Sequence, residues 1–296
     1  MKSPKEFKEQ IINSATSILW NTWKELGAWI NVSREYPIYS DPESAIVFSN
    51  YFDSFEPRLL KISNDWQSYH ANYVNKVRLK RLKRGLSKLY GISFQNKRTP
   101  SNLSNKTIGK LDILKPCNIL LRLRLVFGLS TKAEVIHYLL THEKGNSNEI
   151  AIDRFLNQKA VYTELDKLYK AGVVNEKRQK RERSFSLSQD FANLFFEVEI
   201  EPLSPVWLLV LSVYLLENAL KERIIDDTYL VQSSFFDHKK QITDITQRMG
   251  DCKVAISTKN AEDFYNSIFE YFMCVENNLK VTSIESSIDG TDIKHF

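Results

Sequence analysis

The stretch SNEIAIDRFLNQKAVYTELDKLYKAGVV, from Ser147 to Val174, contains two helical patterns that are separated by only a few residues. The first runs from about Asn148 to Phe155. The second begins at Asn157 and repeats apolar residues at the spacing of one helix face, namely Val161, Leu165 and Leu168. Its first turn is polar. The stretch therefore predicts two short helices joined by a tight turn, the second with an exposed polar end.

The sequence on both sides extends this pattern. Upstream, Thr131–His142 is typical of a helix with Ser130 as its N-cap, because a serine hydroxyl accepts from the free amides of a helix start. Downstream, VVNEKRQKRERSFSLS alternates through two strand-like runs around a basic turn at Gln179–Arg181. Three helices followed by a basic hairpin resemble the winged helix-turn-helix superfamily of bacterial and archaeal DNA-binding regulators. The resemblance covers Leu125 to about Phe195.

The expected fold is mainly α, a multi-domain helical protein with a central winged helix-turn-helix that carries a small β-hairpin wing. Nine glycines and eight prolines among 296 residues favour helices joined by short connections, and this length predicts two or three packed units. A polar break at Thr99–Thr107 and two prolines, Pro202 and Pro205, mark the boundaries. We expect an N-terminal helical domain (1–100) with a basic segment (76–98), a winged helix-turn-helix (115–200), a C-terminal helical domain (203–281) and a flexible tail (282–296).

The N-terminal domain carries local signals for helices. Apolar residues recur at helical spacing between Ile11 and Trp29. Asp41 precedes Pro42, which predicts a helix start, because aspartate is a good N-cap and proline is favoured in the first turn. Pro57 predicts a further start by the same reasoning.

The C-terminal domain predicts helices over Val206–Ile225, about Phe235–Ile256 and Ala261–Leu279. Its most hydrophobic run is shorter than the roughly 20 residues that a membrane-spanning helix needs, so we expect a buried helix. These helices are expected to form a dimer interface or to sense an effector through Trp207, Leu208, Leu209, Leu211, Tyr214, Leu215 and Leu216.

The resemblance implies that the polar end of the second helix binds DNA, because this end enters the major groove in helix-turn-helix proteins. Asparagine and glutamine amides pair with adenine, and lysine pairs with guanine. The matching positions are Asn157, Gln158, Lys159, Tyr162 and Thr163, with Lys167 or Lys170 further along for phosphate. The hairpin is expected to contact phosphates or the minor groove through Lys177, Arg178, Lys180, Arg181 and Arg183.

Two other segments have more than one interpretation. The run Lys76–Arg98 has nine basic residues and no acidic one. Such a helix contacts nucleic acid, an anionic membrane or an acidic partner, or packs its leucines on the N-terminal domain. Trp20, Trp23 and Trp29 could line a ligand pocket, although aromatic residues at helical spacing are more typical of a core.

Composition argues against several other classes of protein. The cysteines, Cys117, Cys252 and Cys274, have neither zinc nor disulfide spacing, so we expect reduced thiols. The charged N-terminus predicts no secretory signal, and with it a cytoplasmic protein without membrane contact. No phosphate-binding loop, nucleophile elbow or metal motif is present in the sequence. We therefore expect neither a cofactor nor enzymatic activity.

The preferred hypothesis is a sequence-specific double-stranded DNA-binding transcriptional regulator that acts as a homodimer, because two recognition helices read a longer site than one. The alternative is an antitoxin-like or defence-associated interaction protein whose helical domains bind a protein partner. Three features together, WxxLG at Trp23–Gly27, the later DPE and a mid-chain winged helix, also resemble bacterial regulator-like proteins encoded near toxin or defence genes. A nucleic-acid-directed enzyme is the third hypothesis, and no visible catalytic constellation favours it.

Overall fold

The computed structural model describes residues 3–32, 38–94, 107–179, 182–194, 205–249, 252 and 254–288, with the backbone alone for 279–288. These residues form thirteen α-helices and one two-stranded antiparallel sheet. The mainly α class that the sequence predicted is therefore confirmed.

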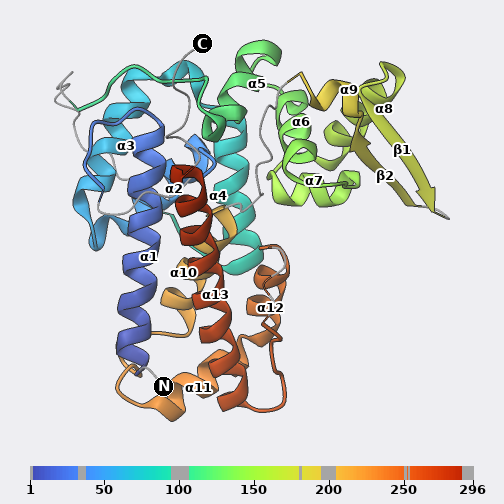
Figure 1. The fold of residues 1–296 in the computed structure, drawn as a ribbon. Helices are drawn as coiled ribbons and strands as arrows, with labels where there is room; N and C mark the ends of the chain where they lie inside the picture. The colour runs from blue at the N-terminus through green and yellow to red at the C-terminus, as the bar shows by residue number, and fades with distance from the viewer. Residues whose placement is uncertain are drawn as a thin grey trace.

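The described residues form two hydrophobic cores, which define a body and a central module. The body contains α1 (Pro4–Glu25), α2 (Pro42–Tyr51), α3 (Pro57–Tyr69), α4 (Lys76–Tyr90), α10 (Pro205–Asn218), α11 (Thr228–Asp237), α12 (Lys239–Gln247) and α13 (Ala261–Ile288). The central module contains α5 (Ile119–Phe127), α6 (Thr131–Thr141), α7 (Ser147–Asp153), α8 (Gln158–Lys170), β1 (Val174–Gln179), β2 (Glu182–Leu187) and α9 (Gln189–Ala192). The module lies to one side of the body (Figure 1).

Helix starts in the N-terminal half follow the local signals of the sequence. Asp41 accepts from the amide of Ser44, and Pro42 is the first residue of α2, as predicted. Pro57 likewise begins α3, and the side chain of Glu56 accepts a hydrogen bond from the amide of Arg58. The first helix starts earlier than predicted, at Pro4, and ends at Glu25, because the chain turns at Gly27 with a φ of +87°.

The N-terminal and C-terminal helices, which the sequence suggested as separate domains, share one core. The ring of Phe7 in α1 contacts Phe235 of α11 and Phe272 of α13, with ring centroids 6.2 and 5.8 Å apart. Helix α10 is buried along its length and packs against α1, α2 and α12. Its apolar side chains, Trp207 to Leu216, are therefore unavailable as a dimer interface, and that expectation was wrong. A helix that is apolar on all sides belongs in a core.

Other boundaries in the C-terminal half differ from the prediction. Helix α10 ends at Asn218, and the expected helix at 235–256 is replaced by α11 and α12, since Asp227 caps a start at Thr228. Helix α13 continues to Ile288, into the expected tail at 282–296. Neither glycine nor proline precedes Gly290 in this segment, so no residue ends the helix earlier.

The expectation of three reduced thiols was wrong for two of them. Cys252 and Cys274 form a disulfide with Cα atoms 6.5 Å apart, and Cys117 is free and half-buried. Their separation of 22 residues matches no disulfide motif. The sequence gives no sign of the pair, because the two cysteines meet only where the chain folds back beside α13. Burial, with a contribution from Glu25, raises the pKa of the Cys117 thiol.

A buried ionic cluster joins the module to the body, and its members are Asp41, Glu43, Arg78, Arg124 and Glu134. These residues come from α2, α4, α5 and α6 and the residue before α2. The guanidinium of Arg78 lies 2.7 Å from Glu43, and that of Arg124 lies 2.6 Å from both Glu43 and Glu134. The cluster therefore fixes the module against the body by paired charges.

Candidate nucleic-acid interface

Helix α8 presents one apolar and one polar face. Val161, Leu165 and Leu168 are buried in the core of the module, as predicted. The residues expected to contact bases are all exposed on the other side: Asn157, Gln158, Lys159, Tyr162 and Thr163. The structure thus places these five side chains together at the start of α8.

Two of the five are already hydrogen-bonded within the helix. Asn157 is the N-cap, and its side-chain oxygen accepts from the amide of Ala160 at 3.1 Å. The hydroxyl of Thr163 donates to the carbonyl of Lys159 at 2.9 Å. A bidentate contact between Asn157 and adenine needs the same side-chain oxygen. Gln158 and Lys159 are therefore the better placed residues for base contacts.

The hairpin lies beside α8 and pairs in a regular antiparallel register from Val174–Leu187 to Gln179–Glu182. Arg183 is largely covered: its guanidinium donates to both carboxylate oxygens of Glu176 at 2.9 Å and to the Tyr162 hydroxyl at 2.7 Å. Hydrogen bonds from Arg183, which has the larger effect, and from Arg178 lower the pKa of the Glu176 carboxyl. Arg183 therefore holds Tyr162 in place.

Several predicted phosphate contacts already have a counter-charge. Lys167 pairs with Glu164 at 2.7 Å, and Arg178 pairs with Glu176. Lys177 is exposed and forms no ion pair with a described residue. Lys180 and Arg181 lie outside the described residues. Fewer of the hairpin's cations are unpaired than the sequence suggested.

The turn between α7 and α8 contains a feature that the sequence analysis missed. Phe155 has a φ of +54°, a left-handed conformation that only glycine adopts without cost. Its ring is buried and stacks on Trp207 of α10 with centroids 5.6 Å apart. Neighbouring Asp153 accepts from the Trp207 indole at 2.7 Å. Burial of the ring therefore holds the turn in this conformation, and a large apolar residue between two short helices was the available signal.

A third backbone segment pairs with the hairpin. The amide of Gly145, between α6 and α7, donates to the carbonyl of Phe185, and the amide of Phe185 donates to the carbonyl of Gly145, both at 2.9 Å. This bridge fixes the hairpin to the start of α7.

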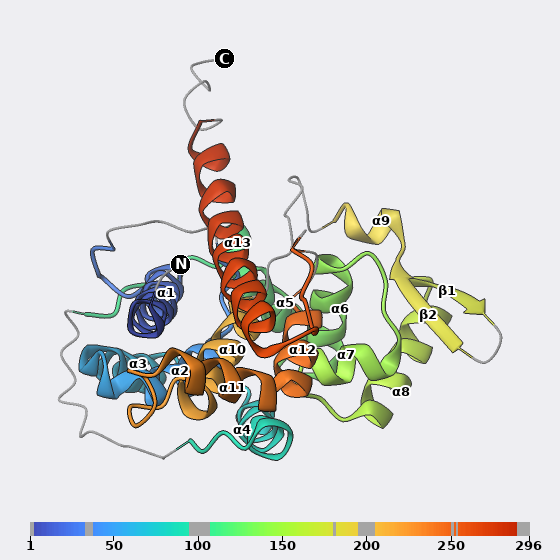
Figure 2. The ribbon, with the colours of Figure 1, turned by 90° about the horizontal axis from the view of Figure 1, so that it is seen from below.

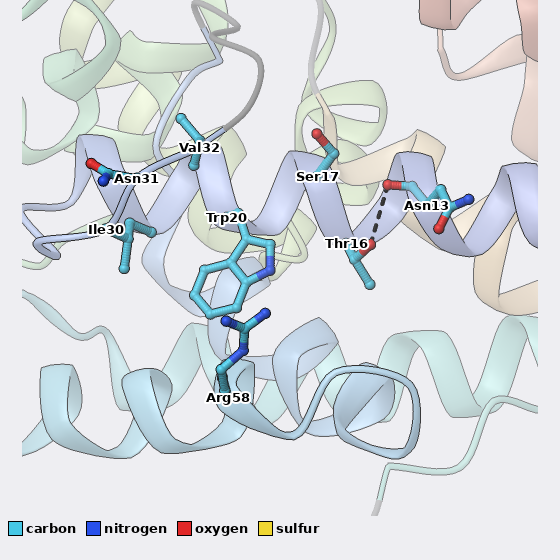
Figure 3. Close-up of a pocket in the computed structure, with 8 residues that line it drawn as sticks. All are labelled: Asn13, Thr16, Ser17, Trp20, Ile30, Asn31, Val32 and Arg58. Carbon is cyan, nitrogen blue, oxygen red and sulfur yellow. Dashed lines mark hydrogen bonds between the residues drawn. The ribbon is translucent and has the colours of Figure 1, made fainter.

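The body contains a separate pocket on the outer side of α1, with a volume of about 730 Å³. Figure 3 shows Trp20 in this pocket with the guanidinium of Arg58 over its ring, 5.3 Å from the centroid. Trp23 is fully buried, as predicted, whereas Trp29 is 73% exposed. The expectation of a core position was therefore wrong for Trp29, because the chain leaves α1 before reaching it.

Among the described helices, none is both long and apolar enough to cross a membrane. In the same part of the chain, no group of three or more histidine, cysteine or acidic side chains is placed to hold a metal ion. Comparisons with protein-family models, curated proteins and solved structures find no match to this chain.

Proposed function

We propose that residues 115–200 form a winged helix-turn-helix domain and that the chain is a sequence-specific double-stranded DNA-binding transcriptional regulator. The observation that carries this proposal is the exposed polar start of α8, which projects Gln158 and Lys159 beside an antiparallel hairpin. An α-helix of roughly 10–12 Å diameter fits the major groove, which is about 12 Å wide.

The order of elements supports the assignment. Helices α6, α7 and α8 follow one another and are followed directly by β1 and β2. The isolated bridge between Gly145 and Phe185 also connects the segment before α7 to the hairpin. In this assignment α8 is the recognition helix and the β1–β2 hairpin is the wing.

The contacts suggest a division of roles within the interface. Gln158 and Lys159 are assigned to base edges, and Lys177 to phosphate. Tyr162, held by Arg183, presents a rigid ring to a thymine methyl or a sugar. Arg183 is a positioning residue in this scheme, since its donors are already used by Glu176 and Tyr162.

Fluorescence anisotropy with the chain's own upstream duplex and a shuffled duplex tests this function. Wild type is expected to prefer the upstream duplex, and Gln158→Ala/Lys159→Ala is expected to lose that preference, because each base contact contributes roughly 1–3 kcal/mol of discrimination. Lys167→Ala, further along α8, is the matched control and keeps the preference. Equal binding of both duplexes by wild type refutes sequence-specific recognition.

A second function, that of an interaction protein, is favoured by an apolar patch at the end of α5. Leu125, Val126 and Leu129 are all exposed there. We propose this patch, rather than α10, as the surface for a homodimer or a protein partner. Light scattering distinguishes a homodimer from binding to another protein. If wild type is a dimer and Val126→Glu is a monomer, the patch mediates self-association. If wild type is a monomer, the patch is assigned to another protein.

A further inference from the structure

Helix α4 carries four cations at intervals of four residues, Lys76, Lys80, Arg84 and Lys88, which we name the α4 stripe. All four are exposed, and none forms an ion pair with a described residue. Twelve residues of helix extend about 18 Å, so the α4 stripe is a row of uncompensated positive charge of that length. Like charges spaced by one turn repel one another and destabilise a helix slightly. Of the four, Lys88 in the last turn interacts favourably with the helix C-terminus, whereas the other three have no stabilising role within α4.

A different face of α4, which carries Arg78 and Gly85, fixes the helix to the turn before α8. Arg78 donates through Nε to the backbone carbonyl of Arg154 at 3.1 Å. Gly85 packs so closely on Phe155 that a Cβ at this position would lie 3.1 Å from the Phe155 ring. Phe155 precedes the N-cap of α8, Asn157, by two residues. The α4 stripe is thus held at a fixed position close to the start of α8.

Around the axis of α4, the C-terminal end of the α4 stripe lies nearest this contact. Successive residues turn by 100°, so Lys88 and Arg84 lie about 60° and 100° around the axis from Gly85, and Lys80 and Lys76 lie about 140° and 180° from it. Figure 2 shows α4 and α8 together at the lower edge of the molecule, with the rest of the body above α4. Because the stripe lies about half a turn around the helix from the buried Leu82 and Leu86, it faces away from the body, at the edge where Figure 2 also shows α8.

The charges of α8 and the hairpin show what the stripe adds. Lys167, Lys170, Arg178 and Arg183 are neutralised by acidic neighbours. Within the described part of these elements, Lys159 and Lys177 are the cations without an ion pair. Because the affinity for a duplex grows with the number of phosphates neutralised, further unpaired cations beside α8 would strengthen binding.

We propose that the α4 stripe is a second phosphate-binding surface, which contacts the duplex backbone beside the site that α8 reads. This inference rests on the proposed DNA-binding function and adds a contact outside the winged helix-turn-helix. Its ligand is the phosphate backbone of double-stranded DNA, so it contributes affinity without base preference. Residues of the body thereby take part in DNA binding.

The expected effect follows from counterion release. Each phosphate contact contributes about 0.9 to the slope of log affinity against log salt concentration. Lys80→Gln/Arg84→Gln is therefore expected to reduce this slope by about 1.8. If the variant and wild type bind equally at 1 M salt, this difference in slope makes the variant bind roughly 60-fold more weakly at 0.1 M salt. Glutamine has nearly the helix propensity of lysine and arginine, so α4 is expected to remain folded.

The test uses the full chain and measures anisotropy with the upstream and shuffled duplexes at several salt concentrations. Lys80→Gln/Arg84→Gln should weaken binding to both duplexes equally and keep the preference between them. Lys80→Arg/Arg84→Lys preserves the charge and should bind as wild type does. Lys61→Gln/Lys259→Gln removes two exposed lysines from elsewhere on the body and should leave the slope unchanged.

Each contrary result has a distinct meaning. If wild type binds duplex and Lys80→Gln/Arg84→Gln matches the Lys61→Gln/Lys259→Gln control, the α4 stripe is not a DNA contact and the proposed function stands. If wild type binds no duplex at low salt, both proposals fail. Binding of wild type to phosphatidylserine vesicles instead, lost in the α4 variant, would assign the stripe to a membrane surface and overturn the inference.

Discussion

Replacing Arg78 with methionine removes one of the two arginines from the buried ionic cluster. Arg78 is 1% exposed and lies 2.7 Å or less from Asp41 and Glu43. Without it, Arg124 alone faces three buried carboxylates. Removing one partner of a buried ion pair costs about 3–5 kcal/mol, because the remaining charge stays buried without compensation. We expect the upper end of this range, since Arg78 also donates to the carbonyl of Arg154.

The loss should depend on pH in a defined direction. Burial opposes the charge of Asp41, but Arg78 outweighs it and lowers the pKa of the Asp41 carboxyl. In wild type the folded pKa lies below the unfolded value, so this stabilisation is present above about pH 4 and is lost as the pH falls further. In Arg78→Met only Arg124 and the Ser44 amide still oppose the effect of burial, so the folded pKa of Asp41 rises. The difference between the proteins should therefore be largest near pH 7 and shrink toward about pH 4.

Urea unfolding followed by circular dichroism at several pH values measures both effects. Arg84→Met, on the exposed face of the same helix, is the control and should change the free energy of unfolding by less than about 0.5 kcal/mol. A loss below about 1 kcal/mol in Arg78→Met, or a loss that is the same at every pH, would refute this account of the cluster.

Two further predictions concern the turn and the disulfide. Phe155→Ala should cost about 3–5 kcal/mol, because a buried ring is lost against Trp207, whereas Phe155→Gly should cost about 1 kcal/mol less, since glycine accepts the positive φ. Urea titrations of both variants check the order, and a more stable alanine variant would contradict it. Reduction of Cys252–Cys274 should lower the free energy of unfolding by about 3 kcal/mol and the Tm by about 5 °C, because the cross-link closes a loop of 22 residues. Calorimetry with and without reductant measures this shift, and an unchanged Tm would show that the cross-link contributes nothing.

The elements that the sequence predicted well have short-range causes. The starts at Pro42 and Pro57 depend on residues within one turn, and the apolar stripe of α8 depends on spacing alone. The five exposed side chains at the start of α8 follow from that stripe, because a helix that buries one face exposes the other.

The features that the sequence did not predict depend on contacts between distant residues. Nothing local shows that Arg183 will bind Glu176 and Tyr162, since the pairing is set by the hairpin register and by the packing of α8 on β1. The position of Phe155 against Trp207, in an element fifty residues later in the chain, has the same origin. The ionic cluster likewise needs four helices to meet, so its arginine in α4 looked like one more member of a basic run.

The shared core has a consequence for how the protein is made. Helices α1 to α4 leave the ribosome well before α10, yet α10 fills the centre of the core that they help to form. During synthesis their apolar faces stay uncovered while the whole central module emerges. The module has a core of its own, so its packing depends less on α10 than theirs does. The chain is therefore most prone to aggregation, and most accessible to chaperones, after α1 to α4 have emerged and before α10 has.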